Sequence, residues 1–204
     1  DNGGMSGANF GGASRVVDPS RLDSAYSTSN LPLRGAKGWL YEGGIRVPMI
    51  VKWPEKFSDS SLIVEEPVIS TDFYPSLLEM AGLPARDEQA LDGVSFVPAL
   101  NGELFNRGPI FWHFPQYSNH GMQSPGGAVR FGDYKLLEYF ENNTVQLFNL
   151  REDIGERNDL SQTEPVIREE LRGLLRSWRE DVNAQMPPRN PDYDPSQYPH
   201  TGLP

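Results

Sequence analysis

The sequence predicts an α/β chain that ends in a small antiparallel sheet covered by a long C-terminal helix. Short apolar runs, separated by Gly, Asp or Asn, follow one another between residues 108 and 150 and are typical of consecutive β-strands. Apolar residues then recur at helical spacing between residues 164 and 186. With 37% hydrophobic and 23% charged residues, the 204-residue chain can bury a core of this size.

The first hundred residues are expected to complete a larger α/β structure. Residues 1–34 are rich in Gly, Ser and Asn and have no sustained period, which indicates a long loop held by other segments. The proline-flanked apolar run at 47–51 predicts a buried strand of a larger sheet. Residues 70–82 begin with short polar side chains, repeat apolar ones at helical spacing and stop at Gly82, which predicts an amphipathic helix.

The later half supplies the small sheet and its helix. Four runs predict the strands: PIFWHF, GAVRFG, YKLLEYF and TVQLFNL. Between Glu164 and Met186 the apolar residues lie on one helix face, which can cover the sheet: Ile167, Leu171, Leu174, Leu175, Trp178 and Val182. The proline-rich residues 187–204 predict an extended surface tail.

Charge and composition exclude several classes of function. The formal net charge is −10, and residues 61–204 hold eleven Lys/Arg against 22 Asp/Glu, which argues against nucleic-acid binding and against docking on acidic membranes. An anionic substrate would therefore have to meet a local basic site. The absence of cysteine rules out disulfides and thiolate chemistry. No apolar run could span a membrane, and the start at Asp1, without an export leader, leads us to expect that the chain is truncated.

Two clusters of residues carry chemistry that fits a metal or an oxyanion. Asp1 and Asn2 offer a carboxylate and an amide oxygen before two glycines, the hard ligands that calcium prefers, although the same residues also suit an ordinary turn. Lys37, between small residues, can hold a tetrahedral oxyanion as a compact point charge. The alternative for Lys37 is a solvated loop lysine.

Other polar residues favour structural roles. Glu42 and Arg46, four apart around two glycines, predict a structural ion pair. His113 lies in a strand-like run between Trp112 and Phe114, where a histidine is more often structural than a substrate contact.

An ordered series of segments resembles the type I sulfatases over nearly the whole chain: DNGG, LPLRGAKGWLYEGGIRVPMIVKWP, PVISTDFYPSLLEMAGL, DGVSFVPAL, AVRFGDYKLL and LFNL. The segment from Arg34 to Pro48 is the most specific part. The resemblance implies the α/β fold of the alkaline phosphatase superfamily. Residues 1–100 would complete its large domain, and residues 101–204 would form a small C-terminal α+β subdomain with an extended tail.

The resemblance also implies roles for single residues. Asp1 and Asn2 match a pair of calcium ligands, Lys37 matches the lysine that contacts the sulfate group, and His113 is a weaker match to the substrate pocket. The family mechanism uses a formylglycine formed from Cys or Ser in a C/S-x-P-x-R motif. No segment matches this motif, because the nearest one has Asn30 at the nucleophile position. We therefore expect the nucleophile in a missing N-terminal region and little activity or calcium binding from this chain alone.

Three functions follow from these expectations. The first is hydrolysis of a sulfate ester, that of a sulfated carbohydrate in preference to an aryl sulfate. The family resemblance implies a periplasmic, secreted or lysosomal setting. The second is hydrolysis of a phosphomonoester or phosphonate, because tetrahedral oxyanions resemble one another. The third is a non-catalytic glycan-binding or structural module with an aromatic platform formed by Trp112, Phe114, Tyr117 and His120.

Overall fold

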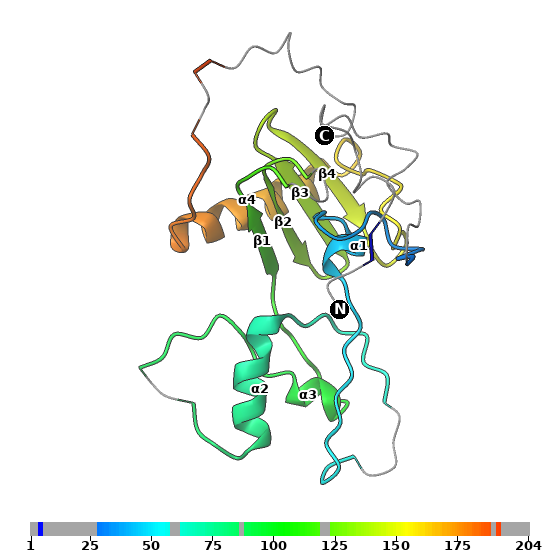
Figure 1. Cartoon of the computed structure of the whole chain (residues 1–204), viewed down its shortest axis with the longest axis vertical. Coiled ribbons are helices and arrows are strands. Elements are labelled where there is room, and N and C mark those ends of the chain that lie inside the picture. The colour runs from blue at the N-terminus through cyan, green and yellow to red at the C-terminus, as the bar shows by residue number, and fades with distance from the viewer. Residues whose placement is uncertain are drawn as a thin grey trace. The chain divides into compact units, whose positions relative to one another are not determined.

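The chain folds into two compact units, one formed by residues 1–48 with 109–204 and the other by residues 49–108 (Figure 1). The structure is a computed structural model, and it describes residues 4–5, 28–57, 62–85, 88–118, 123–188 and 191–192. Most of the predicted surface tail lies outside the described residues. No helix in the described ranges is long and apolar enough to cross a bilayer.

The larger unit is built on a four-stranded antiparallel sheet with strand order β1-β2-β3-β4. The strands are β1 Ile110–Phe114, β2 Gly126–Phe131, β3 Tyr134–Tyr139 and β4 Thr144–Asn149. Phe131 pairs with Tyr134 across a two-residue turn in which Gly132 adopts a φ of 58°, a conformation that suits glycine. The small antiparallel sheet predicted from the sequence is confirmed.

Helix α4, Pro165–Asp181, covers one face of this sheet (Figure 1). Its Leu171 and Leu175 are buried in one apolar cluster with three strand residues: Val129, Leu136 and Leu147. Trp178 stacks on Phe111, with ring centroids 4.9 Å apart. The predicted helix is confirmed, but Val182 follows its last residue and is exposed.

The smaller unit contains the short 3-10 helix Ser70–Asp72, helix α2 Phe73–Met80 and helix α3 Val97–Leu100. The buried Asp72 accepts the backbone N–H groups of Ile69 and Val94 at 2.9 and 3.0 Å. Arg107 donates to both of its carboxylate oxygens at 2.9 Å. The predicted helix at 70–82 is thus confirmed, and it ends where Gly82, at a φ of 65°, donates to Glu79 O.

The strand predicted at 47–51 is wrong for this structure. Residues 47–51 are not in a strand, and their side chains are exposed, from 37% for Val51 to 95% for Ile50. A strand requires a neighbour to pair its backbone N–H and C=O groups, and no described strand pairs with this segment. The apolar pattern of the segment therefore has no partner surface among the described residues.

Candidate functional site

Residues 34–46, which we term the Lys37 loop, form a closely folded segment that contains the short helix α1, Glu42–Ile45. The N–H of Gly43 donates to Arg34 O at 2.8 Å and closes the loop. Two residues adopt positive φ, which favours glycine: Gly35 at 73° and Gly38 at 89°. The backbone of the loop is therefore fixed by its own hydrogen bonds and by its glycines.

Gly43 and Gly44 let two backbone stretches of the Lys37 loop lie closer together than residues with a Cβ atom would allow. A Cβ atom on Gly43 would lie 2.4 Å from Gly35 O, and one on Gly44 would lie 2.1 Å from Trp39 O. Both distances are well inside van der Waals contact. The sequence motif Glu-Gly-Gly thus reflects backbone packing.

Lys37 lies half-buried in the middle of this loop. Its backbone N–H donates to Gly4 O at 2.9 Å, and Asn30 holds Gly4 by two more hydrogen bonds, each 3.1 Å long. Asp1 and Asn2 themselves lie outside the described residues.

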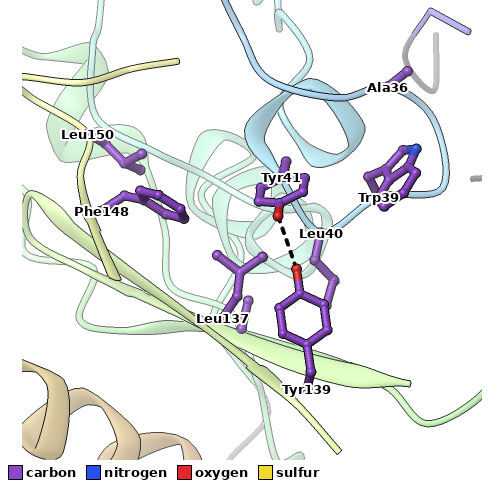
Figure 2. Close-up of a cluster of buried hydrophobic side chains, with 9 residues drawn as sticks. Ala36, Trp39, Leu40, Tyr41, Leu137, Tyr139, Phe148 and Leu150 are labelled. Atoms are coloured by element: carbon purple, nitrogen blue, oxygen red, sulfur yellow. Dashed lines mark hydrogen bonds between the residues drawn. The ribbon is translucent and has the colours of Figure 1, made fainter. Parts of the chain in front are cut away.

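The loop packs on the sheet face opposite α4 (Figure 2). Four loop residues are buried there, Ala36, Trp39, Leu40 and Tyr41, against the following residues of the sheet and the segment after it: Ala128, Leu137, Tyr139, Phe148 and Leu150. The hydroxyls of Tyr139 and Tyr41 face each other at 3.4 Å (Figure 2). Burial raises the pKa of both phenols, which keeps them neutral at physiological pH.

Buried amides add polar contacts to this interface. Gln123, 1% exposed, accepts the backbone N–H of Leu40 at 3.0 Å. Gln146 accepts the Tyr41 hydroxyl at 2.8 Å. The loop is thus positioned by directional hydrogen bonds as well as by apolar contacts.

A buried charge cluster joins the loop to the sheet. The Lys135 ammonium, 0% exposed, lies 2.9 Å from a carboxylate oxygen of Glu42 and 2.9 Å from one of Glu156. Arg130 and Arg46 each approach Glu42 at 3.6 Å. The predicted Glu42–Arg46 ion pair is therefore confirmed, but it forms only one edge of a larger cluster.

The buried charge cluster shifts the pKa values of Glu42 and Glu156 in opposite directions. Burial raises the pKa of Glu42, but the cations Lys135, Arg130 and Arg46 outweigh burial and leave the pKa below its ordinary value of 4.5. For Glu156, burial raises the pKa above 4.5, and Lys135 offsets only part of that rise. Glu42 is therefore the more firmly ionised member of the pair.

His113 lies on the other face of the sheet. Its Nε2 is 2.8 Å from Gln185 O, and its ring lies 5.6 Å from that of Phe140. Its neighbours Trp112 and Phe114 pack on the cluster beneath the Lys37 loop. The structure therefore separates His113 from the Lys37 loop and from these two aromatic residues, and His120 lies outside the described residues.

Sequence reasoning missed the residues that hold the loop from the sheet side. Lys135 shares a face with the apolar Leu137 and Tyr139 in YKLLEY, and this inward position is the signal that could have revealed it. Glu156 offers no comparable pattern, because it lies in a turn.

The donor set of this chain fits calcium only in part. Asp1 and Asn2 supply hard oxygen ligands, but two side chains fall short of the roughly six to eight oxygens that calcium binds. Within the described ranges, no group of three or more His, Cys, Asp or Glu side chains could hold a metal ion. A calcium site would therefore need ligands beyond those two.

Comparison with known proteins assigns the family. Residues 36–181 match the family described as N-sulphoglucosamine sulphohydrolase, C-terminal. The chain belongs to this sulfatase family. It is 36% identical over 171 residues to a sulfatase of Formosa agariphila, which covers 77% of this chain, and 26% identical over 207 residues to human steryl-sulfatase, which covers 87%.

A solved structure shares the fold of this chain. Ps i-CgsB in complex with k-i-k-neocarrahexaose matches 76% of the chain at 31% identity, with a TM-score of 0.63. The chain spans only 33% of that structure, and 31% and 34% of the two sequence relatives. The fold of this sulfatase chain is thus that of about the last third of a family member, as the sequence resemblance implied.

We expect Gly44→Ala to destabilise the larger unit by about 3 kcal/mol, because the new Cβ would collide with the loop backbone. Gly173→Ala is the matched control, since a Cβ there meets no atom within 4 Å and alanine favours the helix, for a gain of about 0.5–1 kcal/mol. Urea unfolding followed by tryptophan fluorescence measures both. Equal midpoints for Gly44→Ala and the wild type would contradict the packing argument.

We expect the free energy of unfolding to fall less on acidification in Glu42→Gln than in the wild type. The folded pKa of Glu42 lies below its unfolded value, so its contribution is present above pH 4.5 and is lost as pH falls through the folded pKa. Glu156 acts in the opposite sense, because its raised pKa favours the folded state below pH 4.5 and this contribution is lost as pH rises.

Urea unfolding between about pH 3.5 and 7 tests the contribution of Glu42. Toward acid pH, the free energy of unfolding should fall more steeply for the wild type than for Glu42→Gln. The exposed control Glu170→Gln should follow the wild type. An equally steep fall for wild type and Glu42→Gln would show that Glu42 is not the group that titrates.

Proposed function

We propose that the protein acts in sulfate ester hydrolysis and that Lys37 contacts the sulfate group. The observation that carries this proposal is the Lys37 loop, a closely folded segment whose one lysine is held next to Gly4 by its backbone N–H. A rigid loop holds its ammonium where negative charge develops, so the charge is stabilised without a cost of reorganisation. The family assignment supplies the reaction class.

The residues of this chain would act electrostatically. As the ester S–O bond breaks, the Lys37 ammonium stabilises the charge on the sulfate oxygens as a point charge. Asp1 and Asn2 would hold part of a calcium site, and calcium when bound supplies Lewis-acid stabilisation of the same oxygens. We propose that the formylglycine nucleophile belongs to a region outside these 204 residues.

That region would also bury the apolar residues that remain exposed in the smaller unit. Ile50, Ile63 and Leu104 are 95%, 85% and 95% exposed. Covering these side chains would remove apolar surface from water, which favours the association of the smaller unit with such a region. We propose that residues 1–100 complete a large α/β domain with the missing sulfatase region, and that residues 101–204 form its small C-terminal subdomain.

A sulfated carbohydrate is the substrate class that we favour. The support is Ps i-CgsB, which resembles this chain at a TM-score of 0.63 and was solved with k-i-k-neocarrahexaose. His113 remains a candidate for substrate binding, because its buried Nδ1 has no hydrogen-bond partner in the part of the chain that the structure describes. Its contact with Gln185 is the structural role that competes with this one.

Replacing Lys37 with alanine should lower turnover of an aryl sulfate by about 10²–10³-fold in the enzyme that contains the nucleophile, because one preorganised charge is removed. Lys56→Ala, at an exposed turn, is the control and should retain wild-type turnover. Turnover is measured in parallel with an aryl phosphate. Preferred turnover of the phosphate would favour the phosphomonoester alternative, and equal sulfate turnover in Lys37→Ala would remove Lys37 from the site.

Replacing Asp1 or Asn2 with alanine should weaken calcium binding to that enzyme at least 10-fold, because each change removes one oxygen ligand. Isothermal titration with calcium measures the affinity, and Asp192→Ala, at a surface turn, serves as the control. Calcium affinity that is unchanged in both variants would place the metal ligands elsewhere.

A further inference from the structure

Glu156 contacts both ends of the Lys37 loop. Its carboxylate Oε2 accepts the backbone N–H of Glu42 at 2.7 Å, near the end of the loop. Its backbone O accepts Arg34 Nη1 at 2.8 Å, at the beginning of the loop. Its other carboxylate oxygen lies 2.9 Å from Lys135, which also contacts Glu42. One residue outside the loop therefore fixes the separation of the two loop ends.

The backbone of Glu156 is itself unusual. It adopts a φ of 52° and is 0% exposed, although a left-handed conformation favours glycine and burial disfavours a carboxylate. Residues held in such conformations cluster at functional sites, where the surrounding structure enforces them. Asp153 helps to enforce this turn, because its O accepts the N–H of Glu156 at 3.1 Å.

We propose that Glu156 and Lys135 are positioning residues for the Lys37 ammonium. Through them the small C-terminal sheet sets where the loop presents its lysine to the substrate oxyanion. This inference rests on the proposed function of Lys37. Neither residue touches the substrate in this scheme, because both side chains are buried beneath the loop.

The chemistry of the cluster fits positioning better than stability alone. A buried ion pair gives little net stability, because removing the charges from water offsets their attraction. Its contacts are directional, however, so a displaced partner leaves an unpaired buried charge. A buried cluster of this kind therefore enforces one geometry of the loop, which is the property that a preorganised oxyanion site requires.

The test is a double-mutant cycle with Glu156→Gln and Lys37→Ala in the enzyme that contains the nucleophile. A glutamine at 156 can still accept the Glu42 N–H, but it removes the charge next to Lys135. Glu138→Gln is the matched control, since Glu138 is a buried carboxylate of the same sheet that binds Arg172 and Arg179 of α4 on the opposite face. kcat and KM for an aryl sulfate are measured with thermal unfolding of each variant.

Glu156→Gln should lower kcat/KM about 10-fold in folded enzyme, because a small displacement of a preorganised charge is enough to slow the reaction. The same change should have no effect when Lys37 is already alanine. Glu138→Gln should lower the unfolding temperature and leave kcat/KM within about 2-fold. If Glu156→Gln does not fold, Glu156→Asp, which keeps the charge but withdraws the carboxylate, is measured in the same cycle.

Three outcomes would overturn the inference: unchanged kcat/KM in Glu156→Gln, an equal loss in Glu138→Gln, or a full further loss on the Lys37→Ala background. Wild-type turnover in Lys37→Ala would instead overturn the proposed function. Hydrogen exchange of this chain tests positioning without activity. Glu156→Gln should speed exchange of the Leu40 and Glu42 amides relative to strands β2 and β3, and uniform or unchanged exchange would count against a positioning role.

Discussion

The contact of Lys135 with two carboxylates is the constraint on which the larger unit depends. An ammonium that is 0% exposed would be costly to bury alone, and so would either carboxylate. The three charges compensate one another only when the Lys37 loop lies on the sheet in one position. The apolar contacts of Tyr41 and Leu40 favour burial of the loop but would persist if the loop shifted along the sheet. The ion contacts would be lost on such a shift.

The alternation of side chains along a strand explains how one small sheet binds the Lys37 loop on one face and α4 on the other. Residues of β3 alternate between faces, so Lys135 lies under the loop while Glu138 lies under α4. Each charge is neutralised by the element that covers its face: Glu42 for the lysine, Arg172 and Arg179 for the glutamate. A shift of β3 by one residue would exchange the two faces and leave both charges unpaired, so the charges specify the register as strongly as the apolar residues do.

Local patterns in the sequence were sufficient for the parts of the fold that depend on local contacts. The alternation of the four strands and the helical spacing of Leu171 and Leu175 are complete within short windows, and both elements were confirmed. The run at 47–51 has the same apolar character, but strand formation requires a partner that a window cannot reveal. Lys135 and Glu42 are 93 residues apart, so their contact was equally invisible from local spacing.

Local charge matters more than the net charge of −10 for the proposed encounter with an anionic ester. Four cationic side chains around the Lys37 loop contact Glu42 or Glu156: Arg34, Arg46, Arg130 and Lys135. Salt screens distant exposed charges beyond about 8–10 Å, so the acidic residues elsewhere contribute little at the loop. An oxyanion at the proposed site would therefore meet a potential set chiefly by the charged groups of this cluster and not by the net charge of the chain.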